Sequence, residues 1–230
     1  MKPGFIQILQ EGLLLFKKNI LIILVISVIN FALSYIISIF TVFLTLILTA
    51  FFSKTVVVII VIFVSYLLNI SVGILMYSAL VISIVTKDTS QAVPISKQLQ
   101  YIFQRFIPVF ITLYLYSFIC MFGMILLIIP GLIFTIKYSQ SLFFALVGGE
   151  GPIKSLKSSA RITHGKYLHL MGLNLILTML IGVLLLPPVF ISIQFFSQFQ
   201  SLITVILTSL SGTILTMFQY AIWKFLTQHT

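Results

Sequence analysis

Acidic residues are almost absent from this chain of 230 residues. Three Asp and Glu side chains stand against thirteen Lys and Arg, and charged residues make up only 7% of the sequence. Soluble domains carry about 25% charged residues. Together with a hydrophobic content of 60%, this scarcity excludes a water-soluble domain and predicts an integral membrane protein with little chain outside the bilayer.

Other absences exclude classes of function. Cys120 is the single cysteine, so the chain cannot form an internal disulfide or a cysteine metal cluster. The sequence contains no phosphate-binding loop, no Gly-x-Ser-x-Gly and no zinc signature. His164 and His169 lack the spacing of a helical metal pair. We therefore predict a protein that is not an enzyme and uses no cofactor or metal. Apolar segments without acidic residues also argue against an ion-coupled transporter.

The net charge of +10 indicates membrane topology rather than nucleic-acid binding. The basic residues lie between apolar segments, where the positive-inside rule places cytoplasmic Lys and Arg. Only Lys54 is predicted on the outer side. An even number of spans must then separate the basic segments, which predicts both termini in the cytoplasm of a bacterial inner membrane. The partners expected from this charge are anionic lipid headgroups, with no nucleic acid.

The hydropathy pattern predicts an all-α polytopic fold in a single domain, 1–230. About six transmembrane helices should form three hairpins, each preceded by an amphipathic interfacial helix. Proline breaks are expected inside the second and third pairs of spans, at Pro130–Gly131 and Pro187–Pro188. The hairpin units cover about 5–86, 94–148 and 152–224, with interfacial helices at 5–18, 94–105 and 152–166 and first spans at 20–45 and 56–86. Residues 5–18 also fit the beginning of the first span.

Lys137 is the one cation expected inside the membrane. It follows Gly131 by six residues, and a charge near the bilayer centre costs about 3 kcal/mol unless it is paired or hydrated. We expect its ammonium to face a cavity and meet an anion such as a lipid phosphate; the alternative is that it snorkels to the outer interface or contacts backbone carbonyls. On the third interfacial helix, apolar side chains should face lipid (Ile153, Leu156, Ala160, Ile162) and cations should face headgroups (Lys154, Lys157, Arg161, Lys166).

The polar residues inside the spans are predicted to hold helices together. Hydrogen bonds between spans are each worth about 1 kcal/mol, and they account for Asn30, Asn69, Asn174 and Gln219. Small side chains should let the last span pack closely, and the phenylalanines should face lipid. The small residues concerned are Ser209, Ser211 and Gly212, and Trp223 beside Lys224 is typical of a cytoplasmic interface.

Residues 129–167 carry a family resemblance. Ile129–Pro130–Gly131, Lys137–Tyr138, Glu150, the helix with Ser159 and the segment Thr163-His164-Gly165-Lys166-Tyr167 resemble the membrane domain of bacterial glycerophosphoryl diester phosphodiesterases and YciC-type six-span inner-membrane proteins. The resemblance implies a structural motif of Pro130, Gly131, Glu150, Ser159 and Gly165. His164 departs from the pattern, which has Lys or Arg there. The hydrolase domain has no counterpart in this sequence.

The expected function is therefore non-enzymatic: binding or handling an anionic lipid or an envelope precursor, through Lys137, Lys154, Lys157, Arg161 and Lys166. Two alternatives suit a small, basic, multispan chain. One is protection against membrane-active peptides, and the other is the membrane subunit of a transporter with a separate ATPase. A homo-oligomer or a protein partner fits either alternative.

Overall fold

The computed structural model describes residues 5–89, 93–195 and 200–228, and these residues form helices and connecting turns with no β-strand. The helices in chain order are α1 (Phe5–Thr49), α2 (Lys54–Asp88), α3 (Ile95–Leu126), α4 (Ile128–Tyr138), α5 (Ser141–Leu146), α6 (Pro152–Thr163), α7 (Tyr167–Phe195) and α8 (Gln200–Gln228).

The long helices are those of a multi-pass membrane protein. Among the described residues, four segments are long and apolar enough to cross a bilayer: Ile6–Thr49, Lys54–Asp88, Ile95–Leu126 and Ile128–Leu146. A fifth is possible if α6 and the first part of α7, which meet at 98°, are taken as one bent span. Many large apolar side chains on α1, α2 and α3 are exposed, as expected for surfaces in contact with lipid tails.

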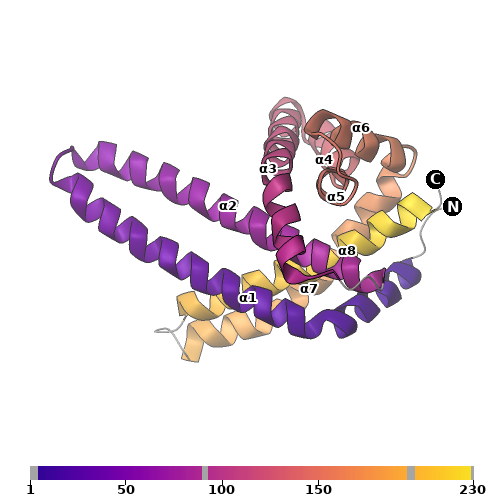
Figure 1. Cartoon of the computed structure of the whole chain (residues 1–230), viewed down its shortest axis with the longest axis horizontal. Helices are drawn as coiled ribbons and strands as arrows, with labels where there is room; N and C mark the ends of the chain where they lie inside the picture. Colours follow the sequence, from indigo (N-terminus) through magenta and orange to yellow (C-terminus); the bar gives the residue numbers. More distant parts are fainter. Residues whose placement is uncertain (1–4, 90–92, 196–199, 229–230) are drawn as a thin grey trace.

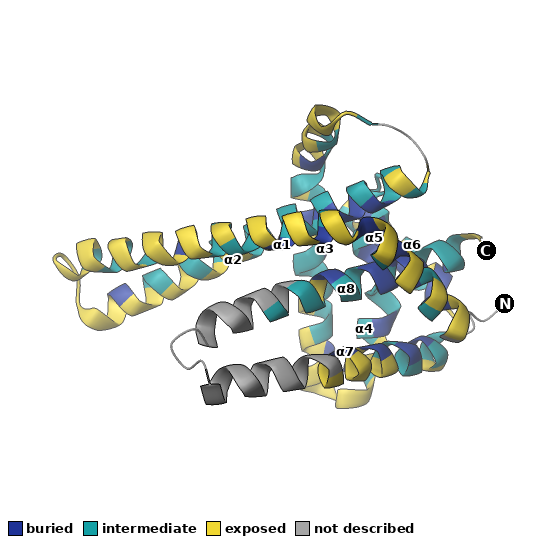
Figure 2. Cartoon of the chain, turned by 90° about the horizontal axis from the view of Figure 1, so that it is seen from below, coloured by how far each residue is buried: buried dark blue, intermediate teal, exposed yellow. Residues whose placement is uncertain are grey.

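The helices pack as neighbours in pairs around a small core. Helices α1 and α2 lie side by side and project away from the rest of the protein, while α3 packs on α4 and α7 on α8 (Figure 1). The far end of the α1–α2 pair is largely exposed (Figure 2). Buried side chains gather where the first half of α1 and the end of α2 meet α5, α6 and α8.

Two of the predicted interfacial helices are not separate helices. Helix α1 has 45 residues in one piece, about 68 Å at 1.5 Å per residue, so 5–18 is the beginning of the first long helix. Its buried face carries Ile8 and Leu15, and Gly12 between them lies against Phe218 of α8. Contacts with α8 therefore replace the expected contacts with headgroups. Likewise α3 continues through Pro108 from the segment predicted as interfacial.

The predicted breaks also lie elsewhere. The chain between α3 and α4 turns at Leu127, whose backbone is extended, and Pro130 is the third residue of α4. Proline is tolerated in a first helical turn because the N–H it lacks would have no partner there. Helix α7 runs through Pro187–Pro188 to Phe195. The sequence also predicts Gln194, Gln198 and Gln200 in the outer loop; Gln194 and Gln200 lie in α7 and α8, and Gln198 lies outside the described residues.

The contact between α3 and α4 generates a first prediction. A Cβ added at Gly131 would lie 2.7 Å from the backbone nitrogen of Met124 and 2.8 Å from its Cα. Gly131→Ala should therefore separate the two helices and lower the free energy of unfolding by about 1–3 kcal/mol. Thermal unfolding in detergent measures this loss.

Gly172→Ala on α7 is the matched control, because an added Cβ there meets nothing within 4 Å. It should leave the unfolding temperature unchanged or raise it slightly, since Ala is favoured over Gly in helices by up to about 1 kcal/mol. Equal destabilisation by both variants would contradict the close contact.

Candidate functional site

A shared ion pair joins three helices at one end of the protein. The ammonium of Lys224 on α8 lies 3.0 Å from Oε1 of Glu11 on α1 and 2.8 Å from Oδ2 of Asp88 at the end of α2. The hydroxyl of Tyr220 donates to the same Asp88 oxygen at 3.3 Å. Two of the three acidic side chains in the sequence are thus held by one lysine.

Lys17, Lys18 and Lys87 also lie at this end, and none of them forms an ion pair with Asp or Glu among the described residues. The ammonium of Lys18 donates to the backbone carbonyl of Lys87 at 3.0 Å, which places the two residues together. The ion pairs of the described residues occupy Glu11 and Asp88 with Lys224, and Glu150 with Lys154. The positive charges of Lys18 and Lys87, both exposed, are therefore available to an external anion.

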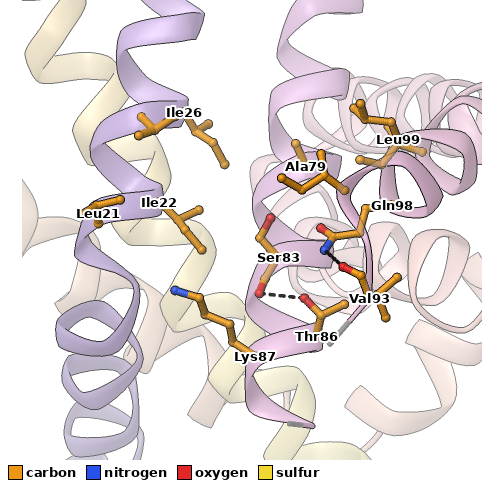
Figure 3. Close-up of a pocket in the computed structure, with 13 residues that line it drawn as sticks. Leu21, Ile22, Ile26, Ala79, Ser83, Thr86, Lys87, Val93, Gln98 and Leu99 are labelled. Carbon is orange, nitrogen blue, oxygen red and sulfur yellow. Dashed lines mark hydrogen bonds between the residues drawn. The ribbon is translucent and has the colours of Figure 1, made fainter. Parts of the chain in front are cut away.

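A cavity of about 690 Å³ begins beside Lys87 and is called here the Lys87 cavity. Its walls come from α1, from the last turns of α2 and from the beginning of α3. Figure 3 shows the ammonium of Lys87 reaching toward Ile22 on α1, with Ala79 and Leu99 farther into the cavity. The volume lies within the roughly 300–1,000 Å³ of small-molecule sites.

Most of the lining of the Lys87 cavity is aliphatic. Leu21, Ile22, Val25 and Ile26 follow Lys18 along α1, and the first two lie one turn beyond it on the same face. The polar groups are engaged locally: the amide of Gln98 donates to the carbonyl of Val93, and Thr86 to that of Ser83 (Figure 3). The cavity thus combines an apolar interior with a cationic end.

The third predicted interfacial helix exists as α6, and its cations share one side. Lys154, Lys157 and Arg161 are exposed, and their spacing of three and four residues places them on one face. Lys166 follows α6 and is half-buried. The apolar residues differ from the prediction: Leu156 and Ile162 are buried inside the protein, whereas Ile153 is exposed.

The buried face of α6 also carries hydroxyl side chains, two of which contact the backbone of Lys137. Ser159 and Thr163 donate to the backbone carbonyl of Lys137 at 2.9 and 3.1 Å, and Ser159 accepts from the backbone N–H of Gln140 at 3.2 Å. These bonds satisfy the backbone where α4 ends. The Lys137 ammonium lies 5.4 Å from the centre of the Tyr138 ring. Lys137 is therefore next to α6, and it does not line the Lys87 cavity.

The remaining motif residues shape the two ends of α6. Arg105 of α3 donates to the carbonyl of Gly149 at 2.7 Å, and Gly149 has φ +66°. Glu150 follows it, 3.8 Å from the exposed Lys154. After α6, Gly165 has φ +71°, a conformation that glycine adopts without steric cost, and this turn sets the 98° bend before α7.

Polar residues connect the last helices, as the sequence indicates. Gln219 of α8 donates to Asn174 of α7 at 2.6 Å and accepts from the buried Gln140 at 2.9 Å, so the predicted bond between spans is confirmed for this pair. Asn69 differs, because it donates to Ser65 within α2. The sequence reasoning did not identify Gln140, although a Gln between two apolar segments is the kind of signal that pointed to Gln219.

Phe143 corrects the expectation that the phenylalanines face lipid. It is 1% exposed, and its ring centre lies 6.2 Å from that of Tyr220 and 6.0 Å from that of Trp223. Trp223, expected as an interfacial anchor, thus packs in an aromatic cluster just before Lys224.

Comparison with protein-family models, with curated proteins and with solved structures gives no match to this chain.

The ion pair at Lys224 generates a second prediction. Lys224→Met would leave Glu11 and Asp88 close together without their cation, so the unfolding free energy should fall by about 1–3 kcal/mol, the range for hydrogen bonds to charged groups. Thermal unfolding in detergent, at neutral pH and low salt, measures the change.

Lys154→Met is the control for this variant, since Lys154 is 75% exposed and 3.8 Å from Glu150. Exposed ion pairs contribute about 0–1 kcal/mol, so little change is expected. A Lys224→Met protein as stable as the control would show that the shared ion pair does not hold the helices together.

Proposed function

We propose that this chain is a non-enzymatic membrane protein that binds an anionic lipid. The acyl chain lies in the Lys87 cavity, and Lys18 and Lys87 hold the headgroup. The observation that carries the proposal is the cavity itself, about 690 Å³, aliphatic along its length and cationic at one end. An amphiphile with a negative headgroup has the same distribution of polarity. A zwitterionic or neutral headgroup would gain less from the cationic end.

The shared ion pair supports this assignment. Without Lys224, Asp88 would be the obvious partner for the lysines near it in sequence and space. Lys224 holds Asp88 at 2.8 Å and Glu11 at 3.0 Å, so its ammonium balances one of these two negative charges on the α8 side. Lys87 lines the cavity, and Lys18, which donates to the Lys87 carbonyl, lies in the adjoining pocket with Glu11 and Asp88. With Lys224, these two lysines exceed the two acids by one positive charge, and each cation near a membrane surface adds about 1 kcal/mol of attraction to anionic lipid.

The exposed face of α6 provides a second, shallower contact with headgroups. Lys154, Lys157 and Arg161 lie on this face, and α6 meets α7 at 98°, which suits a helix lying along the membrane surface beside a span. Lys166 follows this helix and extends the basic surface, and Lys137 of α4 lies beside the opposite, buried face of α6. We assign this surface to electrostatic attraction of anionic lipids and the Lys87 cavity to the bound molecule.

The proposed topology is six spans in three hairpins, with both termini in the cytoplasm of a bacterial inner membrane. Two observations support it. The Glu11–Lys224 ion pair brings the beginnings of the first helix and the end of the last helix together, as an even number of spans requires. Lys54, at the turn between α1 and α2, lies at the opposite end of that pair (Figure 1). The resemblance of residues 129–167 to YciC-type proteins favours the same location.

Lipid binding generates a third prediction. Native mass spectrometry of the full chain with added phosphatidylglycerol should show a one-to-one adduct, and Lys87→Ala should weaken it about fivefold, because 1 kcal/mol of lost attraction corresponds to that factor. Leu99→Trp, which fills the cavity, should also weaken it. Lys54→Ala, at the far turn, should bind like the wild type.

Phosphatidylcholine distinguishes a specific site from general affinity for lipid. Equal adducts with both lipids, or equal binding by Lys87→Ala and Lys54→Ala, would overturn the assignment. A protein that retains no lipid at all would direct the search to protein partners.

The basic face of α6 generates a fourth prediction. Replacing Lys154, Lys157 and Arg161 by Ala should weaken the association of the protein's cytoplasmic face with anionic headgroups by about 1 kcal/mol per cation. The measurement is the number of phosphatidylglycerol molecules retained around the protein in native nanodiscs, at low and high salt. If the attraction is electrostatic, the difference between this variant and the wild type should shrink at high salt, and a difference that does not shrink would contradict it. An unchanged one-to-one adduct in the same variant would show that this surface and the Lys87 cavity bind lipid separately.

A further inference from the structure

A second cavity of about 260 Å³ lies between α1, α2 and α8. It is called here the Ser27 cavity. Ser27 is the central residue of α1, which runs from Phe5 to Thr49, and Thr213 is next to the centre of α8. The cavity therefore lies halfway along the helices that would cross the bilayer, far from the charged ends that hold Lys87 and Lys224.

The lining of the Ser27 cavity is polar but uncharged. Five of its residues carry a hydroxyl or an amide: Ser27, Asn30, Tyr77, Thr213 and Thr216. The others that line it are apolar or glycine, and no Asp, Glu, Lys or Arg is among them. An ion inside such a cavity would have no counter-charge, and ions in hydrocarbon surroundings are costly. The lining thus favours an uncharged molecule that forms hydrogen bonds.

Ser27, which lines this cavity, carries an unsatisfied hydroxyl group. Its side chain is 7% exposed, and its hydroxyl oxygen is buried with no hydrogen-bond partner among the described residues. Buried hydroxyl groups are usually hydrogen-bonded, because leaving one without a partner destabilises the protein. Serines inside helices commonly bond back to the carbonyl one turn earlier, as Ser65 does on α2. Ser27 does not, so its hydroxyl remains able to bond a guest molecule.

Two glycines keep the cavity open. A Cβ added at Gly73 or at Gly212 would meet nothing within 4 Å, although glycine in a membrane helix normally marks close packing. The sequence predicts close packing at Gly212, and the structure corrects this: the residue borders empty space. Both glycines are exposed and line the cavity, so the lack of a side chain leaves the cavity unobstructed at these two positions.

We propose that the Ser27 cavity is a binding site, within the membrane, for a small uncharged molecule or group that bears hydroxyls. Its volume is below the roughly 300–1,000 Å³ of sites for drug-sized ligands, so the guest has few non-hydrogen atoms. A short polyol and a cluster of waters share this chemistry. The site is independent of the Lys87 cavity, because it selects neutral polar groups and the Lys87 cavity selects an anionic amphiphile.

Thiol modification in the full-length protein tests the proposal. In a Cys120→Ser background, Ser27→Cys is treated with hydroxyethyl methanethiosulfonate, which is uncharged and bears a hydroxyl, and in parallel with its trimethylammonium analogue. A thiol reacts as the thiolate, which forms in hydrated sites and not in hydrocarbon, so modification of Ser27→Cys by the neutral reagent should be about tenfold faster than that of Val28→Cys, the control. Val28 is the next residue and is 64% exposed on the lipid-facing side.

The cationic reagent should modify Ser27→Cys at least about tenfold more slowly than the neutral one, because the lining supplies no counter-charge. Gly73→Leu or Gly212→Leu should slow the neutral reagent by filling the cavity, whereas Gly172→Leu on α7 should not. Added glycerol that protects Ser27→Cys identifies a polyol site, and rapid reaction without protection identifies water as the guest. Equal rates at Ser27→Cys and Val28→Cys, or equal rates with both reagents, would overturn the proposal.

Discussion

The shared ion pair of Lys224 with Glu11 and Asp88 is the constraint on which the rest of the structure depends. Three acidic residues in 230 cannot balance thirteen basic ones, so the position of each carboxylate decides which cations remain free. Glu11 and Asp88 come from the first two helices and meet one lysine of the last. The same contact therefore joins the ends of the fold and leaves Lys87, which lines the cavity, without an ion pair among the described residues.

Hydrogen bonding of the backbone imposes the second constraint. Backbone groups exposed at membrane depth must find partners within the protein, and the chain between α4 and α5 leaves such groups at Lys137 and Gln140. Hydroxyls of α6 satisfy both, which explains why the buried face of this helix carries Ser159 and Thr163 beside Leu156 and Ile162. Ser159 thus has a structural role that requires no ligand, whatever the exposed cations on the opposite face bind.

The sequence predicts the class of fold and several particular features. Lys54 lies at the α1–α2 turn, α6 is a separate helix, and Gln219 bonds Asn174 across two helices. The prediction for Lys54 rests on the distribution of charge, and that for α6 on the glycine and proline residues beside it. The prediction for Gln219 rests on the high energy of an unpaired amide in a membrane. Each is a local property of the chain or a strong energetic requirement.

Helix continuity and contacts between distant residues could not be predicted in the same way. The first turns of α1 are apolar on more than one side: Ile8 and Leu15 are buried, whereas Ile6 and Leu13 are exposed. Periodicity alone then does not tell a surface helix from the beginning of a span. The ion pairs of Lys224 need the packing of α8 against α1, a contact between residues far apart in the sequence.

The two cavities are separated by very little protein. Ile26 lines both of them, and on α2 the neighbouring residues Ala79 and Leu80 line one cavity each. Isoleucine in a helix has one strongly preferred χ1 rotamer, so the partition is a stiff side chain and not a flexible one. In the two proposals, an acyl chain would contact one side of Ile26 and a polar guest would contact the other. Both contacts would favour the same rotamer, so the Ile26 side chain would keep the apolar Lys87 cavity separate from the polar Ser27 cavity.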